Sequence, residues 1–416
     1  MLKKLTWLLA ALGVALLLAA CGSSGDSSSS SEATGSSGGS ETGSAEKASN
    51  ESSSDESGEY VELMGDSKYS TPTLVPAAKA EKEGEEFADP EPAKLPNLTV
   101  GWVNFAKAAE SGIRGEYEFV EAAKAIGWKV TTCDGGGTST GYVNCMNTLL
   151  NENVDAIATA ALEPSVISAQ IKQAHSRGIP VVSAGAKVKL GEYDGAFYPV
   201  EKVAPKLVAD FMIEKLEEKE GTKEIVIHTF PAGFAEARAE GVREAIKSHP
   251  DIKIVAENPV EAADAVGGTK KTTETEITQY PDLAAIVDPF DSAISGSAQA
   301  IATKLPGEGF PEAPLLVGWD ALLGSQPYMR QEPPLIAALG DNDYGADSWI
   351  AIDQLAQFFA RKTPVSKEPE PDYGIDYLSP QLVTPEDLLS EERYPPNHSN
   401  YWAFFKGKWA TEFGAE

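Results

Sequence analysis

From Leu98 to Arg361 the sequence alternates short apolar runs with longer segments whose apolar residues recur at helical spacing. The predicted strands cover 98–104, 128–132, 154–158, 179–183, 224–228, 253–257, 283–287, 314–318 and 335–339. The predicted helices cover 113–126, 142–150, 166–176, 203–216, 235–248, 269–279, 292–304 and 344–361. This alternation indicates parallel sheets with helices on both faces. Because the units come in two successive sets, we expect an α/β fold of two similar doubly wound lobes joined by a hinge.

Ligands of doubly wound folds bind beyond the carboxyl ends of the strands. In a protein with two lobes, these ends can face each other across a cleft that closes by a hinge motion. The chain length agrees with this expectation, because the roughly 320 residues from Asn97 onward are too many for one small core and suit two domains.

The start of the chain has the composition of a secretory signal peptide, with a basic start, an apolar run over 8–20 and small residues before Cys21. The run is shorter than the roughly 18 residues that a membrane-spanning helix needs. The stretch Leu18-Ala19-Ala20-Cys21 resembles the bacterial lipobox, whose cysteine receives a diacylglycerol before cleavage. We therefore expect a signal peptide over 1–20 and a lipid on Cys21 that anchors the protein at the extracytoplasmic face of the cell membrane. An ordinary signal peptide with an incidental cysteine is the alternative.

The region after the lipobox is poor in apolar residues. Residues 22–59 are mostly Ser, Gly, Glu, Thr and Ala, and acidic residues and proline persist over 79–96. Such a composition cannot bury enough apolar surface to repay the entropy of ordering. We expect 21–96 to form a disordered tether that holds the folded part away from the membrane, and the fold to begin near Asn97.

The formal net charge of −29 limits the partners of the protein. It argues against nucleic acid and against a basic face that binds anionic lipid. The acidic stretch 341–347 lacks the ligand spacing of a calcium loop. No metal and no cofactor is predicted.

Two cysteines, Cys133 and Cys145, remain after Cys21. An exported protein folds in an oxidising environment, which favours a disulfide between them. That bond would contribute about 3 kcal/mol in the chain-entropy model. A metal site is the alternative, but two cysteines without a nearby histidine pair supply too few ligands.

Several stretches resemble type I periplasmic binding proteins, the ribose-binding-like branch of the solute-binding proteins of ABC transporters. The stretches that carry the resemblance are 119–130, 153–157, 174–182, 280–288 and 317–320. Their order and spacing follow that family from about Leu98 to Val383. The pair Cys133 and Cys145 looks like a feature of a lipoprotein subgroup of this branch.

The resemblance implies delivery of a small solute, often a sugar, to a membrane permease, by a monomer that is not an enzyme. It implies a first lobe of 97–199 and 341–363 and a second lobe of 200–340 and 374–385. Hinge crossings would lie near 198–200, 337–341 and 362–377.

The resemblance also assigns the ligand site. Asp320 matches the carboxylate of the family's Gly-aromatic-Asp strand end, and Asp291 matches an aspartate that follows asparagine in the family. The family's Asp-Arg pair after the fourth strand is replaced by Gly185-Ala186, and its stacking aromatics after the first strand by Ser111-Gly112. The expected ligand-binding residues are Phe105, Glu110, Ser111, Glu163, Phe234, Glu236, Phe290, Asp291, Trp319, Asp320, Asp341 and Asn342.

Each of these residues has a structural alternative. The family's arginine near the start of the second lobe's first helix falls near Glu236, and Arg238 follows half a turn later. The aromatic side chains could simply pack in the core. Asp320 could cap a helix or form a hinge hydrogen bond.

Two other functions are compatible with the sequence. A binding protein of this kind can present its closed form to a receptor, as a sensor does. The stretch Gly137-Thr-Ser-Thr-Gly141 matches the nucleophile elbow of serine hydrolases, although its composition favours a short flexible turn.

The tail, 386–416, has no strong period but carries six aromatic residues that would be a liability if exposed: Tyr394, Tyr401, Trp402, Phe404, Phe405 and Trp409. We expect the tail to pack along a lobe. A docking patch for the permease is the alternative.

Overall fold

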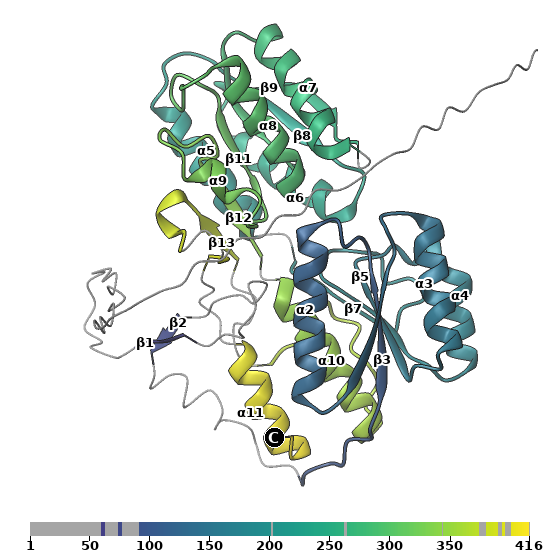
Figure 1. Ribbon diagram of the computed structural model, residues 1–416. Coiled ribbons are helices and arrows are strands. Elements are labelled where there is room, and N and C mark those ends of the chain that lie inside the picture. The colour runs from purple at the N-terminus through teal and green to yellow at the C-terminus, as the bar shows by residue number, and fades with distance from the viewer. Residues whose placement is uncertain are drawn as a thin grey trace, which may run out of the picture. The chain divides into compact units, whose positions relative to one another are not determined.

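Figure 1 shows the computed structural model, which describes residues 60–62, 74–76, 91–200, 203–261, 264–342, 344–373, 380–389, 393–395 and 401–415. Within them the chain forms two sheets of parallel type with helices on both faces, which confirms the predicted fold class. Cys21 and the rest of the signal peptide lie outside the described residues. Among the described residues, no helix is both long enough and apolar enough to cross a membrane.

The first sheet has five parallel strands in the order β4-β3-β5-β6-β7. They are β3 (Thr99–Asn104), β4 (Lys129–Asp134), β5 (Ala156–Ala160), β6 (Val181–Ala184) and β7 (Gly195–Phe197). Figure 1 shows helices α2 (Glu110–Ala125) and α10 (Tyr344–Arg361) on one side of this sheet and helices α3 (Ser139–Asn151) and α4 (Pro164–Ser176) on the other. Helix α10 therefore returns to the first sheet after the chain has formed the second.

The second sheet has six strands in the order β13-β12-β11-β10-β8-β9, and only β13 is antiparallel to its neighbour. The strands are β8 (Lys223–Thr229), β9 (Ile252–Pro259), β10 (Leu283–Val287), β11 (Leu315–Trp319), β12 (Ala338–Asp341) and β13 (Gln381–Val383). One face packs on α5 (Val203–Glu217) and α6 (Gly233–Ile246), and the other packs on α7 (Ala265–Gln279) and α8 (Asp291–Lys304).

The apolar runs in the sequence form the centres of both sheets. Every residue of β5, β6, β10 and β11 is buried, as expected for parallel strands that are covered on both faces. The strand predicted at 335–339 begins only at Ala338. After Pro333 and Pro334 the backbone is irregular, and the Leu335 amide donates to the Tyr328 carbonyl instead of to a neighbouring strand.

The fold begins earlier than expected. Trp128 Nε1 donates to the Pro96 carbonyl at 3.0 Å, and the Ala93 amide donates to the Glu412 carbonyl at 2.8 Å. Ala93 and Leu95 pack against the core of the first lobe. Within the region assigned to a tether, β1 (Tyr60–Glu62) and β2 (Leu74–Pro76) also form an antiparallel pair. Ala93, Leu95 and Pro96, from the region assigned to a tether, thus contact the first lobe.

The tail packs on the first lobe, as its aromatic content predicts. It forms helix α11 (Tyr401–Phe413), whose Trp409 ring lies parallel to Trp349 of α10 with centroids 5.4 Å apart. Trp402 lies 5.0 Å from the same ring. Both tail tryptophans are buried in the core that α2 and α10 form with the sheet.

Two buried carboxylates of the first lobe, those of Glu118 and Asp353, accept hydrogen bonds from side chains of α11. Glu118 Oε2 accepts from the indole N–H of Trp402 at 2.8 Å and of Trp349 at 2.9 Å. Asp353 Oδ1 accepts from Trp409 Nε1 at 2.8 Å and Lys408 Nζ at 2.7 Å. A buried acid is costly unless it is hydrogen-bonded, so α11 is part of the first lobe's structure.

A buried charge network holds the turn that leads from β10 into α8. His228 Nδ1 lies 2.7 Å from Asp288 Oδ1, and Nε2 lies 3.0 Å from Glu276 Oε2. Asn258 Nδ2 donates to Glu276 Oε1 at 2.7 Å. Because both imidazole nitrogens face carboxylates, only the doubly protonated ring can donate to both.

Removal of the Trp409 indole should destabilise the protein strongly. Trp409→Ala leaves a cavity against Trp349 and takes one donor from Asp353, so we expect a loss of about 3–5 kcal/mol and a clearly lower melting temperature. Circular dichroism during heating measures this, with Ala410→Ser on the exposed side of α11 as control. Equal melting temperatures for Trp409→Ala and wild type would contradict the packing described.

The pH dependence of stability should report the charge on His228. Burial opposes this charge, but Asp288 and Glu276 outweigh burial and raise the pKa from 6.5 to about 10. A raised pKa in the folded state gives stability that is complete below pH 6.5 and is lost as the pH rises through about 10.

We therefore expect His228→Gln to lose about 3–5 kcal/mol at pH 7 and to lack this decline in stability toward pH 10. Urea unfolding at pH 7 and pH 10 tests this. His175→Gln, at a histidine on the surface of the first lobe, is the control that should keep the wild-type slope. A His228→Gln protein with an unchanged slope would mean that His228 is not the titrating group.

Candidate functional site

A buried ion pair lies at the carboxyl end of the second sheet. Arg238 of α6 and Asp320, which directly follows β11, form two parallel contacts, Nη2 to Oδ1 at 2.9 Å and Nη1 to Oδ2 at 3.2 Å. Arg238 Nη1 also donates to the Pro289 carbonyl at 2.8 Å. The forked guanidinium thus joins α6, the end of β11 and the turn before α8.

The backbone of Asp320 has a left-handed conformation, with φ of 69°. For a residue other than glycine this costs about 1–3 kcal/mol, and such strain gathers at functional sites. The surroundings hold it in place, because its amide donates to the Gly340 carbonyl at 2.9 Å and its carboxylate is clamped by Arg238. The strained turn directs the Asp320 carboxylate toward α6.

Three half-buried phenylalanines lie beside this pair. Phe230 follows β8, Phe234 is in the first turn of α6, and Phe290 immediately precedes α8. The Phe230 ring meets Phe290 edge to face at 5.2 Å between centroids and lies 6.3 Å from Phe234. Together the three rings form an apolar wall beside the ion pair.

Asp291 begins α8 next to this wall. Burial, the charge of Asp320 and the charge of Glu110 raise its pKa to about 7. Near neutral pH the carboxyl group is therefore present in both forms, and it can either donate or accept a hydrogen bond.

Glu110 reaches across from the first lobe. It begins α2, and its Oε1 and Oε2 accept from the backbone amides of Leu323 at 2.9 Å and Gly324 at 3.1 Å. Since Glu110 also acts on the pKa of Asp291, the carboxylates of the two lobes share one electrostatic environment.

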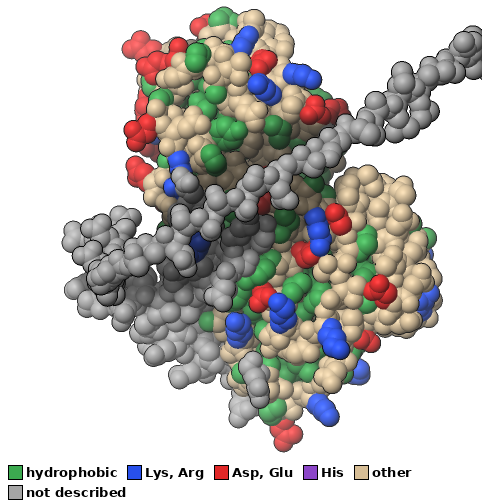
Figure 2. Space-filling model, viewed as in Figure 1, with side chains coloured by type: hydrophobic (Ala, Val, Ile, Leu, Met, Phe, Trp, Pro, Cys, Tyr) green, Lys and Arg blue, Asp and Glu red, His purple; other side chains and the backbone are tan. Residues whose placement is uncertain are grey.

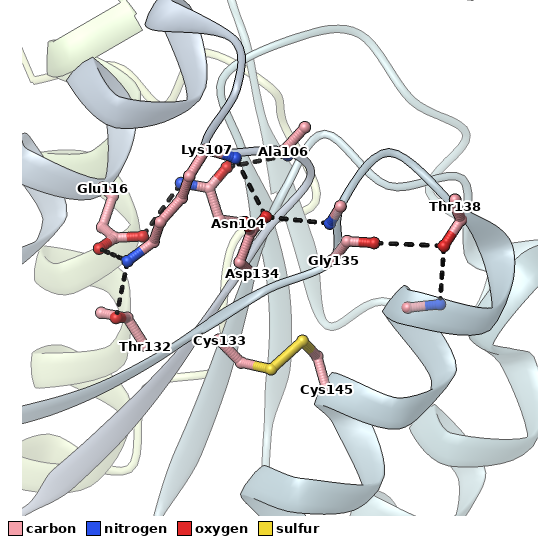
Figure 3. The surroundings of a disulfide bond; sticks show 12 residues. Asn104, Ala106, Lys107, Glu116, Thr132, Cys133, Asp134, Gly135, Thr138 and Cys145 are labelled. Atoms are coloured by element: carbon pink, nitrogen blue, oxygen red, sulfur yellow. Dashed lines mark hydrogen bonds and ion pairs between the residues drawn. A yellow bond between two sulfur atoms is a disulfide. The ribbon is translucent and has the colours of Figure 1, made fainter. Parts of the chain in front are cut away.

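The loop between β3 and α2, which ends at Glu110, is held by a polar network beside the predicted disulfide, and the structure contains this disulfide (Figure 3). Cys133 of β4 is joined to Cys145 of α3. Asp134, which follows Cys133, accepts a hydrogen bond from the Lys107 amide at 3.0 Å. Lys107 Nζ in turn lies 2.6 Å from Glu116 Oε1. The disulfide therefore lies next to Asp134, which holds the loop that leads to Glu110.

Gly112 has no room for the aromatic side chain that the family places here. A Cβ atom there would lie 2.5 Å from the Ala106 carbonyl oxygen and 2.6 Å from Asn104 Oδ1, closer than real Cβ contacts. Asn104 Nδ2 donates to the Gly112 carbonyl at 2.8 Å. The first turn of α2 therefore packs directly on the loop, with half-buried Ser111 beside it.

The two expected hinge residues, Asp341 and Asn342, are both 2 % exposed. Asp341 Oδ1 accepts from the Ala321 amide at 3.3 Å and lies 3.8 Å from Arg114 Nη1. Arg114 lies one turn after Glu110 in α2, so this contact also joins the lobes.

The other expected residues add no polar group to the ion pair. Glu236 is exposed and pairs with Arg243 at 2.9 Å, so Arg238, on the same helix, takes the inward position instead. Trp319 is 1 % exposed and packs in the second lobe's core under Arg238, so it supports the pair from below. Glu163 is half-buried just before α4, and Phe105 packs on the core of the first lobe.

Sequence reasoning missed Phe230 and gave Arg238 only second place. The position of Phe230 directly after a strand was the available signal, since strand ends form the site in this fold. For Arg238, the strand-to-helix spacing alone could not decide which of two neighbouring charged residues faces inward.

The Gly137–Gly141 stretch forms a helix start. Ser139 is the first residue of α3 and is exposed, and Thr138 Oγ1 caps the helix by accepting from the Gly141 amide at 3.0 Å. Of the histidines within the described residues, His228 is buried in the second lobe, His249 follows α6 of the same lobe, and His175 pairs with Asp194. A hydrolytic triad around Ser139 has no support in this geometry.

The surface of the protein carries much of its negative charge. On the face drawn in Figure 2, acidic side chains gather along an edge of the second lobe, whereas lysines and arginines are scattered over the first.

The candidate site combines carboxylates, a guanidinium and an aromatic wall. It can bind a neutral solute that has several hydroxyl groups and a C–H face.

Comparison with known proteins agrees with this fold. The D-allose-binding periplasmic protein of Escherichia coli is 28% identical over 283 residues, which are 65% of this chain and 84% of that protein. The solved structure of an ABC transporter solute-binding protein from Agrobacterium vitis with bound allitol has a TM-score of 0.61 at 18% identity, covering 70% of this chain and 97% of that one.

A solute-binding protein from Burkholderia graminis in complex with D-arabinose has a TM-score of 0.60 at 17% identity, covering 72% of this chain and 98% of that one. At such identities the solved structures show a shared fold. The model of the periplasmic binding protein domain matches residues 108–363, more than half of the chain. The chain therefore belongs to the periplasmic binding protein domain family, whose members bind ligands rather than transform them.

Proposed function

We propose that this protein is the solute-binding lipoprotein of an ABC importer for a sugar or polyol. The observation that carries the proposal is the Arg238–Asp320 pair at the carboxyl end of the second sheet, with Asp291 and the phenylalanine wall beside it. A fixed guanidinium and carboxylates match hydroxyl groups, and the rings match the apolar face of a carbohydrate.

The similarity to proteins that bind D-allose, allitol and D-arabinose supports this class of solute. The solute would lie between the lobes, where Glu110 reaches the loop after β11. Binding there would stabilise the closed form, which a membrane permease could then recognise.

The anchor completes the proposal. A lipid on Cys21 would hold the protein at the outer face of the cell membrane, and the tether after it would allow the lobes to reach the permease. This arrangement keeps a solute trap near the transporter that it serves.

A thermal-shift screen with D-allose, allitol and D-arabinose should detect binding. A solute present at a hundredfold excess over its dissociation constant adds about 2.7 kcal/mol and raises the melting temperature. Asp291→Asn removes a charged hydrogen-bond partner worth about 1.5–3 kcal/mol, so it should weaken binding of the same solute roughly 10- to 100-fold.

The control is Glu240→Gln, on the exposed side of α6, which should bind the solute as wild type does. No shift with any sugar or polyol, together with a shift from an amino acid or nucleoside, would refute the proposed solute class. Equal affinities for Asp291→Asn and wild type would place the solute elsewhere.

The lipid can be tested in the cell. Expression of the full chain in a bacterium fed with radioactive palmitate should label the protein, and Cys21→Ser should abolish the label and release the chain from the membrane fraction. Labelled or membrane-bound Cys21→Ser protein would contradict the assignment of the anchor.

A further inference from the structure

The C-terminal segment, which begins with β13 (Gln381–Val383) and ends with α11 (Tyr401–Phe413), contacts both lobes. Its first part lies on the second lobe, where β13 pairs with β12 from Leu339 opposite Val383 to Asp341 opposite Gln381. Leu388 packs against the core there, and Arg330 Nη2 donates to the Leu389 carbonyl at 3.2 Å. Its last part, α11, is buried in the first lobe.

Residues 393–395 contact both lobes at once. The Arg393 carbonyl accepts from Gln326 Nε2, on α9 (Gln326–Met329) of the second lobe, at 2.8 Å. The next residue, Tyr394, is 0 % exposed, and its ring lies 4.4 Å from the guanidinium of Arg114 in the first lobe. A cation is attracted to an aromatic face more strongly when both are buried than when they are exposed.

This segment lies beyond the part of the chain that defines the family. The family model ends at residue 363, and the described tail that follows β13 comes later in the chain. A hinge of this fold must let the two lobes separate for a solute to enter. A connection fixed by buried contacts at both ends opposes that separation.

We propose that residues 393–395 are a strap that limits how far the lobes open, with Tyr394 on Arg114 as their contact with the first lobe. Gln326 on the Arg393 carbonyl is the matching attachment to the second. When the lobes separate, one of these contacts has to break. The strap therefore favours the closed form even without solute, independently of which solute the protein binds.

Distances between two spin labels test the strap without a solute, so the result does not depend on the proposed function. The labels are placed by Gln173→Cys on α4 and Lys271→Cys on α7, both at exposed positions, in the full chain carrying Cys21→Ser. Electron–electron double resonance then gives the distribution of distances between the lobes. We expect one narrow population in this background.

Tyr394→Ala should add a population at longer distances, and Gln326→Ala should do the same to a smaller extent. Tyr394→Phe keeps the ring over Arg114, so it should reproduce the distribution of the background. Circular dichroism verifies that each variant is folded, and no variant changes a residue of α11 (Tyr401–Phe413). Folded Tyr394→Ala and Gln326→Ala proteins whose distributions both match the background would overturn the strap.

Discussion

The buried pair between Arg238 and Asp320 is the interaction on which the candidate site depends. It joins α6, the end of β11 and the Pro289 carbonyl, so three elements of the second lobe take their positions from one guanidinium. Breaking a buried pair by removing one partner costs about 3–5 kcal/mol, because it leaves a charge without compensation. The pair also holds Asp320 in its left-handed conformation, which places the carboxylate beside Asp291. The candidate site is thus formed by the fold of the second lobe itself.

Several buried charged side chains are paired with partners on neighbouring helices and strands. His228 lies between Asp288 and Glu276 under the turn that carries Phe290, and the indoles of α11 satisfy Glu118 and Asp353 in the first lobe. These networks differ in their consequence. The one around His228 holds the turn of the proposed binding site, whereas the two on α11 attach the tail. Within the described residues, these buried acids are thus compensated by hydrogen-bond donors.

The alternation of strands and helices predicted the two sheets because each apolar run is long enough to fill a buried strand. It missed β7 and β13, which are three residues each, too short for any period to appear. It missed α11 because Lys408 interrupts the apolar positions, although its side chain is buried against Asp353. At the site, the resemblance to the family assigned Asp291 and Asp320 to one group of ligand-binding residues. It could not choose between Glu236 and Arg238, since that choice depends on the rotation of α6 against the sheet.

The location of the site can be measured by hydrogen exchange of the protein with and without a bound sugar or polyol. Solute binding should slow exchange in three segments at the carboxyl ends of the strands, 105–112, 288–293 and 319–324, where Glu110, Asp291 and Asp320 lie. The amides of Leu323 and Gly324, which donate to Glu110, should be among the most protected. Protection confined to another region, such as the exposed groove between α5 and α6 that Lys206 and His249 line, would contradict the account.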